Sequence, residues 1–265
     1  SMAAQAQDTR IIVGDWKCNL WMHNSKSTPT RTWEAFSQPP TRTLNYTACA
    51  SPQGFIISGG FIDTVSNVKA SCFEYAFETK TWRPLPSMQN SRSSHRSIYH
   101  EGSLYVAGGL KGEQEIQTSF LDSVERLHLQ SSQWTSLSPL PRPLQLPLLV
   151  SVSKRLFAMA GWYDHQNQSR MVYEFVDRAW EPKSEMLLDC RDGAAVSFND
   201  RVFIIGGDER RCMLYDPRTD VWVVSVQRPQ FKHWVGAAAL HDNKIILFGG
   251  EGNDEIEEYD PRSDS

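Results

Sequence analysis

The strongest constraint on the fold is a unit of sequence that recurs along the chain and is clearest at residues 201–222. This unit contains an apolar run, the glycine pair Gly206-Gly207, a charged loop, a second apolar run, a polar turn and Trp222. The first position of the pair recurs at steps of 49, 52, 46 and 43 residues, at Gly59, Gly108, Ala160, Gly206 and Gly249. A period of about 50 residues with four short strands per unit is typical of a β-propeller.

The repeat has a physical reason. A four-stranded sheet cannot bury both of its faces alone, whereas sheets packed face to face around an axis bury one another. The apolar runs are nearly continuous, as expected for strands that are covered on both faces. Glycine pairs suit positions with an unusual φ or with no room for a Cβ atom. We expect a tryptophan to pack between neighbouring sheets in each of four units, at Trp82, Trp134, Trp180 and Trp222.

Two motifs recur in phase along the chain. Glycine pairs end four apolar segments, which are FIISGG (55–60), LYVAGG (104–109), VFIIGG (202–207) and IILFGG (245–250). A tyrosine precedes the tryptophan by seven positions in EYAFETKTW (74–82) and LYDPRTDVW (214–222). Over nearly the whole chain this pattern resembles the kelch-repeat family, which implies an all-β, six-bladed propeller with four-stranded antiparallel blades. The D-P-R-T-D turn, the arginines before the first strands and the length also resemble the substrate-recognition domains of BTB-kelch adaptors of cullin-RING ubiquitin ligases.

We expect a single domain over residues 1–265, in which residues 1–10 are a tag or a frayed tail. The six predicted blades span about residues 11–36, 44–85, 93–137, 144–182, 192–226 and 235–265. The first blade is expected to lack its inner strand and the last its outer strand, so both are incomplete in this chain. We therefore expect either that the parent protein continues past Ser265 with a tryptophan or that the ring closes in another way.

Composition and motifs exclude several functional classes. The net charge of −4 argues against a nucleic-acid binder, and no apolar run approaches the roughly 18 residues of a membrane helix. Five widely spaced cysteines without a signal-peptide pattern predict a reducing location, the cytoplasm or the nucleus. The glycine pairs do not match phosphate-binding motifs, and the histidines and cysteines lack metal-site spacing. We therefore expect no cofactor, no metal and no catalytic residue.

Two sets of loop residues are candidates for binding a partner. One set lies just before the first strand of each blade, and comprises Arg42 with Asn45, Arg92 with Ser93, Arg142 with Gln145, Arg191 with Asp192, and Lys232 with His233 and Trp234. The other set follows the glycine pairs, and comprises Phe61, Lys111, Trp162, Tyr163, Arg210 and Arg211. Five basic residues before the strands of an acidic protein indicate a basic surface, because arginine binds carboxylates through a planar fork of donors. Aromatic side chains would supply anchors.

The favoured hypothesis is a non-catalytic propeller that binds a peptide or degron with an acidic segment on its loop face. The resemblance implies that the parent protein is a ubiquitin-ligase adaptor, which would reach a cullin only through BTB and BACK domains that are absent from this chain. A cytoskeletal, actin-binding or scaffolding kelch domain is the main alternative, and a propeller enzyme is a third. The same arginines could instead pair with acids of a neighbouring blade and hold the ring together.

Overall fold

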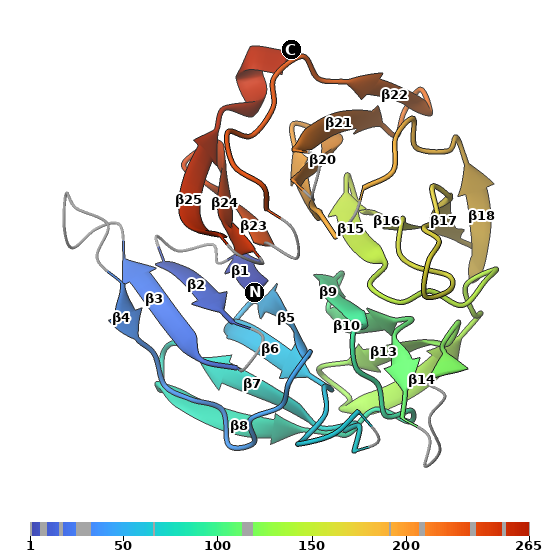
Figure 1. The fold of residues 1–265 in the computed structure, drawn as a ribbon. Helices are drawn as coiled ribbons and strands as arrows, with labels where there is room; N and C mark the ends of the chain where they lie inside the picture. The colour runs from blue at the N-terminus through green and yellow to red at the C-terminus, as the bar shows by residue number, and fades with distance from the viewer. Residues whose placement is uncertain are drawn as a thin grey trace. The chain divides into compact units, whose positions relative to one another are not determined.

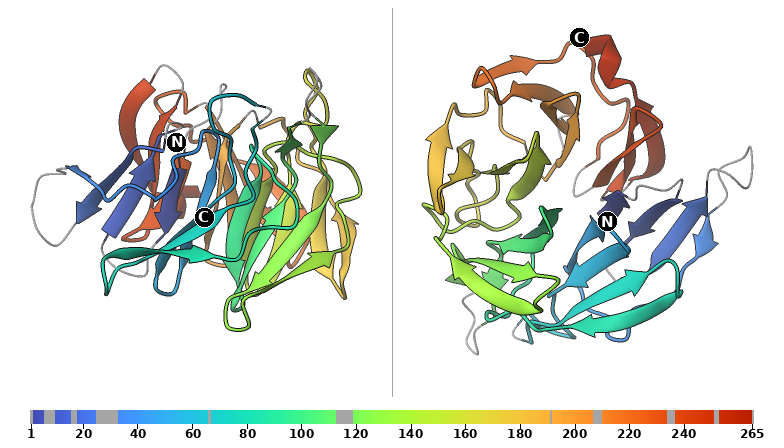
Figure 2. Two further views of the ribbon diagram at one scale, coloured as in Figure 1. Left: turned by 90° about the horizontal axis from the view of Figure 1, so that it is seen from below. Right: turned by 180° about the vertical axis from the view of Figure 1, so that it is seen from behind.

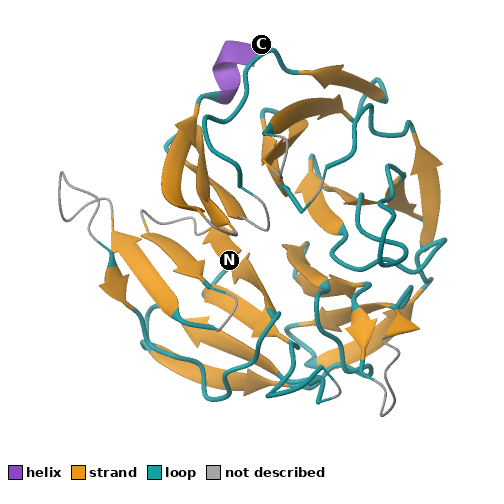
Figure 3. Cartoon of the chain, viewed as in Figure 1, coloured by secondary structure: helices purple, strands orange, loops and turns teal. Residues whose placement is uncertain are grey.

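The computed structural model of the chain describes residues 2–5, 10–15, 18–24, 33–65, 67–112, 119–190, 192–206, 210–233, 237–250 and 253–264. Strands and loops make up nearly all of this part, and the one short helix described, η1 (Pro261–Asp264), lies near the C-terminus (Figure 3). No helix among the described residues is both long and apolar enough to span a membrane. The chain divides into two compact units, an N-terminal unit of residues 2–145 and a C-terminal unit of residues 146–265. The expectation of a single domain stays a prediction.

The N-terminal unit contains three successive antiparallel sheets of four strands each (Figure 1). The first sheet consists of β1 (Met2–Gln5), β2 (Arg10–Gly14), β3 (Leu20–Asn24) and β4 (Glu34–Ala35). The second consists of β5 (Thr47–Ser51), β6 (Gly54–Ser58), β7 (Cys72–Ala76) and β8 (Thr81–Leu85). The third consists of β9 (Arg96–His100), β10 (Ser103–Ala107), β13 (Val124–His128) and β14 (Gln133–Leu137). A small ribbon of β11 (Leu110–Lys111) and β12 (Ser119–Phe120) extends the loop after β10.

The C-terminal unit contains three further antiparallel sheets. The fourth sheet consists of β15 (Leu148–Val152), β16 (Arg155–Met159), β17 (Val172–Val176) and β18 (Ala179–Lys183). The fifth consists of β19 (Ala194–Phe198), β20 (Arg201–Gly206), β21 (Arg211–Asp216) and β22 (Val221–Val224). The sixth has three strands among the described residues, β23 (Ala237–His241), β24 (Lys244–Gly250) and β25 (Asn253–Tyr259).

Within each unit the first strands of successive sheets are neighbours. In the N-terminal unit β5 lies between β1 and β9, and the three sheets follow one another in blue, cyan and green in both views of Figure 2. In the C-terminal unit β19 lies between β15 and β23. Apolar side chains fill the spaces between adjacent sheets within each unit. Phe55 and Tyr75 form one such core with the first sheet, and Val202 and Met213 form another with the fourth.

Three of the four tryptophans join adjacent sheets, as expected from the repeat. The indole Nε1 of Trp82 donates to the Ser37 carbonyl at 3.3 Å, that of Trp134 to Pro86 at 2.8 Å, and that of Trp222 to Ser184 at 2.9 Å. Each acceptor lies four residues after the tryptophan of the sheet before. Ser37 follows Trp33, Pro86 follows Trp82 and Ser184 follows Trp180 at this distance. The indole thus ties the last strand of one sheet to the end of the sheet before it.

The glycine pairs have the conformation that glycine favours. Gly108 and Gly109 have φ values of 66° and 100°, and a Cβ atom on Gly109 would lie 2.6 Å from the Ser93 carbonyl oxygen. In the fourth sheet the first position is Ala160, at a φ of 57°. The left-handed region is only moderately unfavourable for alanine there, whereas a φ near that of Gly109 is nearly restricted to glycine.

Substitutions at the two positions of the pair are therefore expected to have different effects on the free energy of unfolding. Gly109→Ala should lower the free energy of unfolding by at least about 1–3 kcal/mol, because strain and a backbone clash act together. Ala160→Gly should change it by less than about 1 kcal/mol, since relief of strain offsets the greater freedom of glycine in the unfolded chain. Urea unfolding of both variants measures the difference. Equal free energies of unfolding for the two variants would contradict this account of the pair.

The first sheet differs from the sequence-based expectation. Residues 2–5, expected to belong to a tag or a frayed tail, form β1, which pairs antiparallel with β2 from Met2 opposite Gly14 to Gln5 opposite Ile11. The first blade therefore has an inner strand, and the expectation that it lacks one is wrong. The sequence MAAQ is short and lies outside the repeating glycine and tryptophan motifs, and β1 covers an edge that β2 would otherwise leave unpaired.

Candidate functional site

The two predicted sets of loop residues lie at the same end of their sheets. We call the segment directly before the first strand of a sheet its leading loop, and the segment directly after the glycine pair its glycine-pair loop. In the second sheet Leu44 of the leading loop forms a β-bridge with Phe61 of the glycine-pair loop. In the third sheet Ser93 forms the same bridge with Leu110. One end of each sheet therefore carries both loops, which is the condition for a common binding face.

One position of the leading loop recurs by its contact. The side chains of Thr43, Arg92 and His233 each hydrogen-bond a carbonyl of the glycine pair, those of Gly59, Gly108 and Gly249, at 2.8 Å in all three cases. Each of these residues precedes its glycine by 16 positions. We call this position the latch position. In the fourth and fifth sheets the same count gives Leu144 and Cys190.

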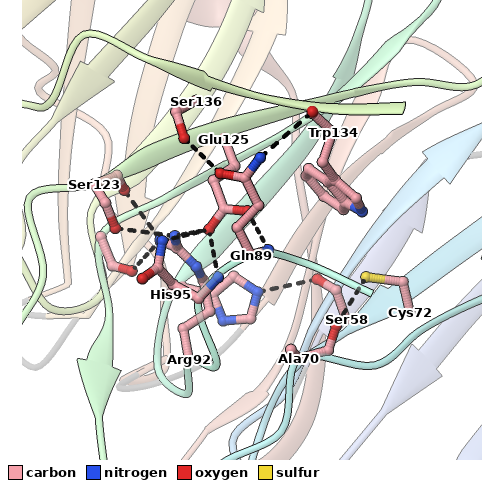
Figure 4. A network of polar contacts seen from close by, with 12 residues as sticks. Ser58, Ala70, Cys72, Gln89, Arg92, His95, Ser123, Glu125, Trp134 and Ser136 are labelled. Carbon is pink, nitrogen blue, oxygen red and sulfur yellow. Dashed lines mark hydrogen bonds and ion pairs between the residues drawn. The ribbon is translucent and has the colours of Figure 1, made fainter. Parts of the chain in front are cut away.

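Arg92 is the centre of a buried polar network in the third sheet (Figure 4). Its guanidinium donates to the carbonyls of Gly108 and Ser123 at 2.8 and 3.0 Å, and to the Glu125 carboxylate at 2.6 Å. Glu125 also accepts the backbone N–H groups of Gln89 and Asn90 at 2.6 and 3.0 Å. The side chains of Arg92 and Glu125 are 0% and 1% exposed, and burial lowers the pKa of Arg92 from its usual value although Glu125 opposes this.

The sixth sheet repeats this network with a histidine. Glu257 accepts the backbone N–H groups of Gln230 and Phe231 at 2.6 and 3.2 Å, and its Oε2 lies 3.3 Å from His233 Nε2. The two carboxylates have the same place in their sheets: Glu125 pairs with Val106 and Glu257 with Leu247, each two residues before the first glycine. A basic side chain at the latch position and a carboxylate on the third strand thus form the same arrangement in the third and sixth sheets.

This geometry corrects part of the predicted binding set. Arg92, Ser93 and His233 are buried and make internal contacts, so the alternative that such residues hold the fold together applies to them. The five basic residues of the leading loops are also not equivalent, because they precede the first glycine by different distances: 17 residues for Arg42, 16 for Arg92, 18 for Arg142, 15 for Arg191 and 17 for Lys232. Counting back from the glycine would have separated Arg92 and His233 from the others at the sequence level.

The other predicted residues of residues 2–145 lie nearer the surface. Arg42 is exposed and its guanidinium donates to the side-chain oxygen of Asn19, while Asn45 is exposed with a φ of 50°. Lys111 is exposed on β11, and Phe61 is half-buried by its bridges to Leu44 and Val68. Arg142 and Gln145 are also half-buried.

In the C-terminal unit the predicted residues connect three neighbouring sheets. Trp162 is half-buried, and its indole Nε1 donates to Asp192 Oδ1 of the fifth sheet's leading loop at 2.8 Å. Arg210, exposed at the start of β21, donates to the Gln230 carbonyl of the sixth sheet's leading loop at 2.9 Å. Lys232 is exposed in that same loop, whereas Tyr163 and Arg211 are half-buried. Arg191 and Trp234 lie outside the residues that the structure describes.

The described side chains do not form a site for covalent chemistry. Ser58 Oγ lies 3.0 Å from His95 Nε2, but both side chains are buried, so this pair joins the second and third sheets rather than facing a substrate. Burial, followed by Arg92 and Arg96, holds the pKa of His95 well below its usual range. Burial likewise raises the pKa values of the Cys49 and Cys72 thiols to about 12, which keeps both protonated and unreactive. Within the described ranges no cluster of three His, Cys, Asp or Glu residues is placed to hold a metal ion.

Comparison with known proteins agrees with this architecture. The Kelch motif family matches residues 91–141. Over 97% of the chain the fold superimposes on 92% of the solved structure of YjhT, with a TM-score of 0.80 at 13% sequence identity. The predicted all-β, six-bladed propeller fold is therefore confirmed, and the match at residues 91–141 makes the chain similar to kelch-repeat proteins.

Proteins with similar sequences show which kelch-containing proteins the chain resembles. The chain is 26% identical to Kelch-like protein 38 of Rattus norvegicus over 98% of its length, and 26% identical to the Homo sapiens protein over 90%. An F-box/kelch-repeat protein of Arabidopsis thaliana is 23% identical over 87% of the chain. The chain spans about half the length of the kelch-like relatives it matches, 47% of the rat protein and 42% of the human one. The chain is thus similar to part of each of these kelch-like proteins.

Proposed function

We propose that this propeller is a non-catalytic protein-interaction domain, which binds an extended segment of a partner protein through the loops that carry Trp162, Asp192, Arg210 and Lys232. The observation that carries the proposal is that two hydrogen bonds, Trp162 to Asp192 and Arg210 to Gln230, link loop residues of three neighbouring sheets at one end of the C-terminal unit. Side chains that are already held by such bonds lose less conformational entropy when they bind a partner.

The chemistry of this face favours a peptide with acidic residues. Trp162 presents a half-exposed aromatic ring that is held by one hydrogen bond, which is the kind of anchor enriched at binding hot spots. Arg210 and Lys232 add two exposed cationic side chains. The hydrogen bond from Arg210 to the Gln230 carbonyl uses one guanidinium nitrogen, Nη1. The planar guanidinium group carries further N–H donors. A carboxylate on a partner segment would complement these two charges.

The similarity to kelch-like proteins extends the proposal to the parent protein. We infer that the domain recognises substrates for a cullin-RING ubiquitin ligase, and that further domains of the parent protein, of the BTB and BACK kind, would contact the cullin. This is in keeping with the chain covering about half of each kelch-like relative. With this role we also propose a location in the cytoplasm or the nucleus, where such substrates would be met.

Affinity capture from a cell lysate, scored by mass spectrometry, tests the proposed face. The wild-type domain is compared with a Trp162→Ala/Arg210→Ala/Lys232→Ala variant. Partners that use this face should be depleted by about 30-fold or more, because truncation of a single hot-spot residue costs about 2 kcal/mol. Acidic segments shared among the lost proteins would then be synthesised as peptides and their affinities measured directly.

A control variant tests whether loss of a positive charge matters only on the proposed face. Lys154→Asn removes an exposed lysine from the β15–β16 hairpin, at the opposite end of the fourth sheet, and asparagine tolerates the φ of 62° found there. It should retain every partner. Retention of the same partners by the triple variant, with an unchanged thermal melt, would exclude this face and favour a scaffolding role through the blade sides.

A further inference from the structure

The outer strand of the fifth sheet, β22, presents an apolar edge. It comes last in the strand order of that sheet, so among the described strands one side of its backbone has no neighbour (Figure 1). Val221, Val223 and Val224 are 51%, 56% and 39% exposed, and Val226 just after the strand is 92% exposed. We propose that β22 pairs with β22 of a second copy of this chain, antiparallel and about a two-fold axis. The inference does not depend on the proposed function.

The outer strands of the second, third and fourth sheets have residues that oppose such pairing. β8 carries Arg83 and Pro84, and β18 carries Glu181, Pro182 and Lys183. Charged side chains and prolines on an edge strand hinder its pairing with another chain. The exposed positions of β14 are all polar. β22 has the sequence VWVV, without a charge, a proline or a polar side chain, so its edge lacks this protection.

The valines are exposed because of their position in the sheet. The tryptophans of β8 and β22 each pair with a tyrosine of the third strand, so Val221 and Val223 correspond to Thr81 and Arg83. Thr81 and Arg83 are also exposed, although the sheet that follows them has four strands. The three strands described for the sixth sheet therefore do not account for the exposure of the valines.

The backbone of β22 specifies how a second copy would pair. Its ladder with β21 extends one residue past the strand, because the Ser225 N–H donates to the Cys212 carbonyl at 2.9 Å. Bonds in an antiparallel ladder come from alternate residues, so the N–H and C=O groups of Trp222 and Val224 point to the open edge. The centre of the extended ladder is Val223. Pairing about this centre places Trp222 of each copy opposite Val224 of the other, and Val223 opposite Val223.

The charges around β22 favour a second copy in this orientation. Residues 221–226 are uncharged, so two copies meet without like-charge repulsion. The turn before β22 is acidic overall, since it carries Asp216, Arg218 and Asp220, whereas the exposed Arg228 follows the strand. Antiparallel pairing brings the acidic end of one copy towards the basic end of the other. Once two such edges have paired, neither has backbone groups left to offer, so association stops at a dimer.

Sedimentation velocity of the whole chain between about 10 µM and 1 mM tests the proposal, because so small an interface gives a weak complex. The wild type should shift from monomer to dimer over this range. Val223→Lys should weaken the association by about tenfold or more, because two lysines would face each other at the axis. Val65→Lys is the matched control. Val65 is 55% exposed in a loop of the N-terminal unit, so this variant should dimerise like the wild type.

A disulfide trap tests the register and does not depend on the folding of the lysine variant. Residues directly opposite each other in a non-hydrogen-bonded pair have Cα atoms about 4.5 Å apart, which a disulfide can span. Oxidised glutathione should therefore link Val223→Cys into a dimer, whereas Val65→Cys and the wild type should stay unlinked. A wild type that remains monomeric up to about 1 mM overturns the proposal and leaves the edge to a strand of another protein. Undiminished dimerisation of folded Val223→Lys, or no cross-link in Val223→Cys, overturns it equally.

Discussion

Glu125→Ala is expected to lower the free energy of unfolding by about 3–5 kcal/mol, because it leaves the guanidinium of Arg92 buried without its carboxylate. The Arg92 and Glu125 side chains are 0% and 1% exposed, so water cannot replace the lost partner. The backbone N–H groups of Gln89 and Asn90 lose their acceptor at the same time. Urea unfolding followed by tryptophan fluorescence measures the change.

Two comparison variants define what the loss means. Glu78→Ala removes an exposed glutamate from a turn and should change the free energy of unfolding by no more than about 0.5 kcal/mol. The double variant Arg92→Met/Glu125→Leu removes both charges and should be more stable than Glu125→Ala, while the unpaired amides of Gln89 and Asn90 keep it below the wild type. A Glu125→Ala protein as stable as Glu78→Ala would show that the buried ion pair is not needed for stability.

Trp222→Ala is the second substitution with a large expected effect, a loss of about 3–5 kcal/mol in the free energy of unfolding. Trp222 is 7% exposed and packs with the core between the fourth and fifth sheets. Its ring stacks on Tyr215 with centroids 4.7 Å apart and an interplanar angle of 27°, and its Nε1 donates to the Ser184 carbonyl. Truncation therefore creates a cavity and removes a hydrogen bond between sheets.

The neighbouring residue gives a matched control in the same strand. Val223 is 56% exposed, so Val223→Ala should alter the free energy of unfolding by about 0.5 kcal/mol or less. Trp222→Phe keeps most of the ring packing but lacks the indole N–H, and its stability should lie between those of Trp222→Ala and the wild type. If Trp222→Ala unfolded at the same urea concentration as Val223→Ala, the indole would have no part in joining the two sheets.

Much of the fold could be predicted because the same apolar runs, glycine pairs and tryptophans recur at a regular spacing along the chain. The apolar runs before the glycine pairs became the second strands of their sheets, as in β10 before Gly108-Gly109, and the positive φ values of those glycines follow from the same motif. The strand β1 was not predicted, because MAAQ is short and lies outside the repeating glycine and tryptophan motifs, and it pairs with the edge of β2. The fourth sheet departs from the repeat at Trp180, whose cross-strand partner is Phe175, five residues before it, because a shorter hairpin joins β17 to β18.

The candidate site was predicted less completely than the fold. The sequence indicated that leading loops and glycine-pair loops share one end of a sheet, and the bridge from Leu44 to Phe61 shows this arrangement. It did not reveal which basic side chains point inward, because that depends on a shift of one or two residues before the strand. Arg92 and Lys232 both precede a first strand and differ by one residue in their spacing from the first glycine, yet one is 0% exposed and the other is exposed. The binding roles of the exposed residues stay predictions.

The direction of the indole hydrogen bonds has a consequence for synthesis. Each donor lies later in the chain than its acceptor: Trp82 after Ser37, Trp134 after Pro86 and Trp222 after Ser184. As the chain leaves the ribosome, each tryptophan emerges after its carbonyl acceptor has been made, so these links can form in order from the N-terminus without waiting for later sequence. Within each unit, a growing chain can therefore add one sheet at a time to a surface that already exists.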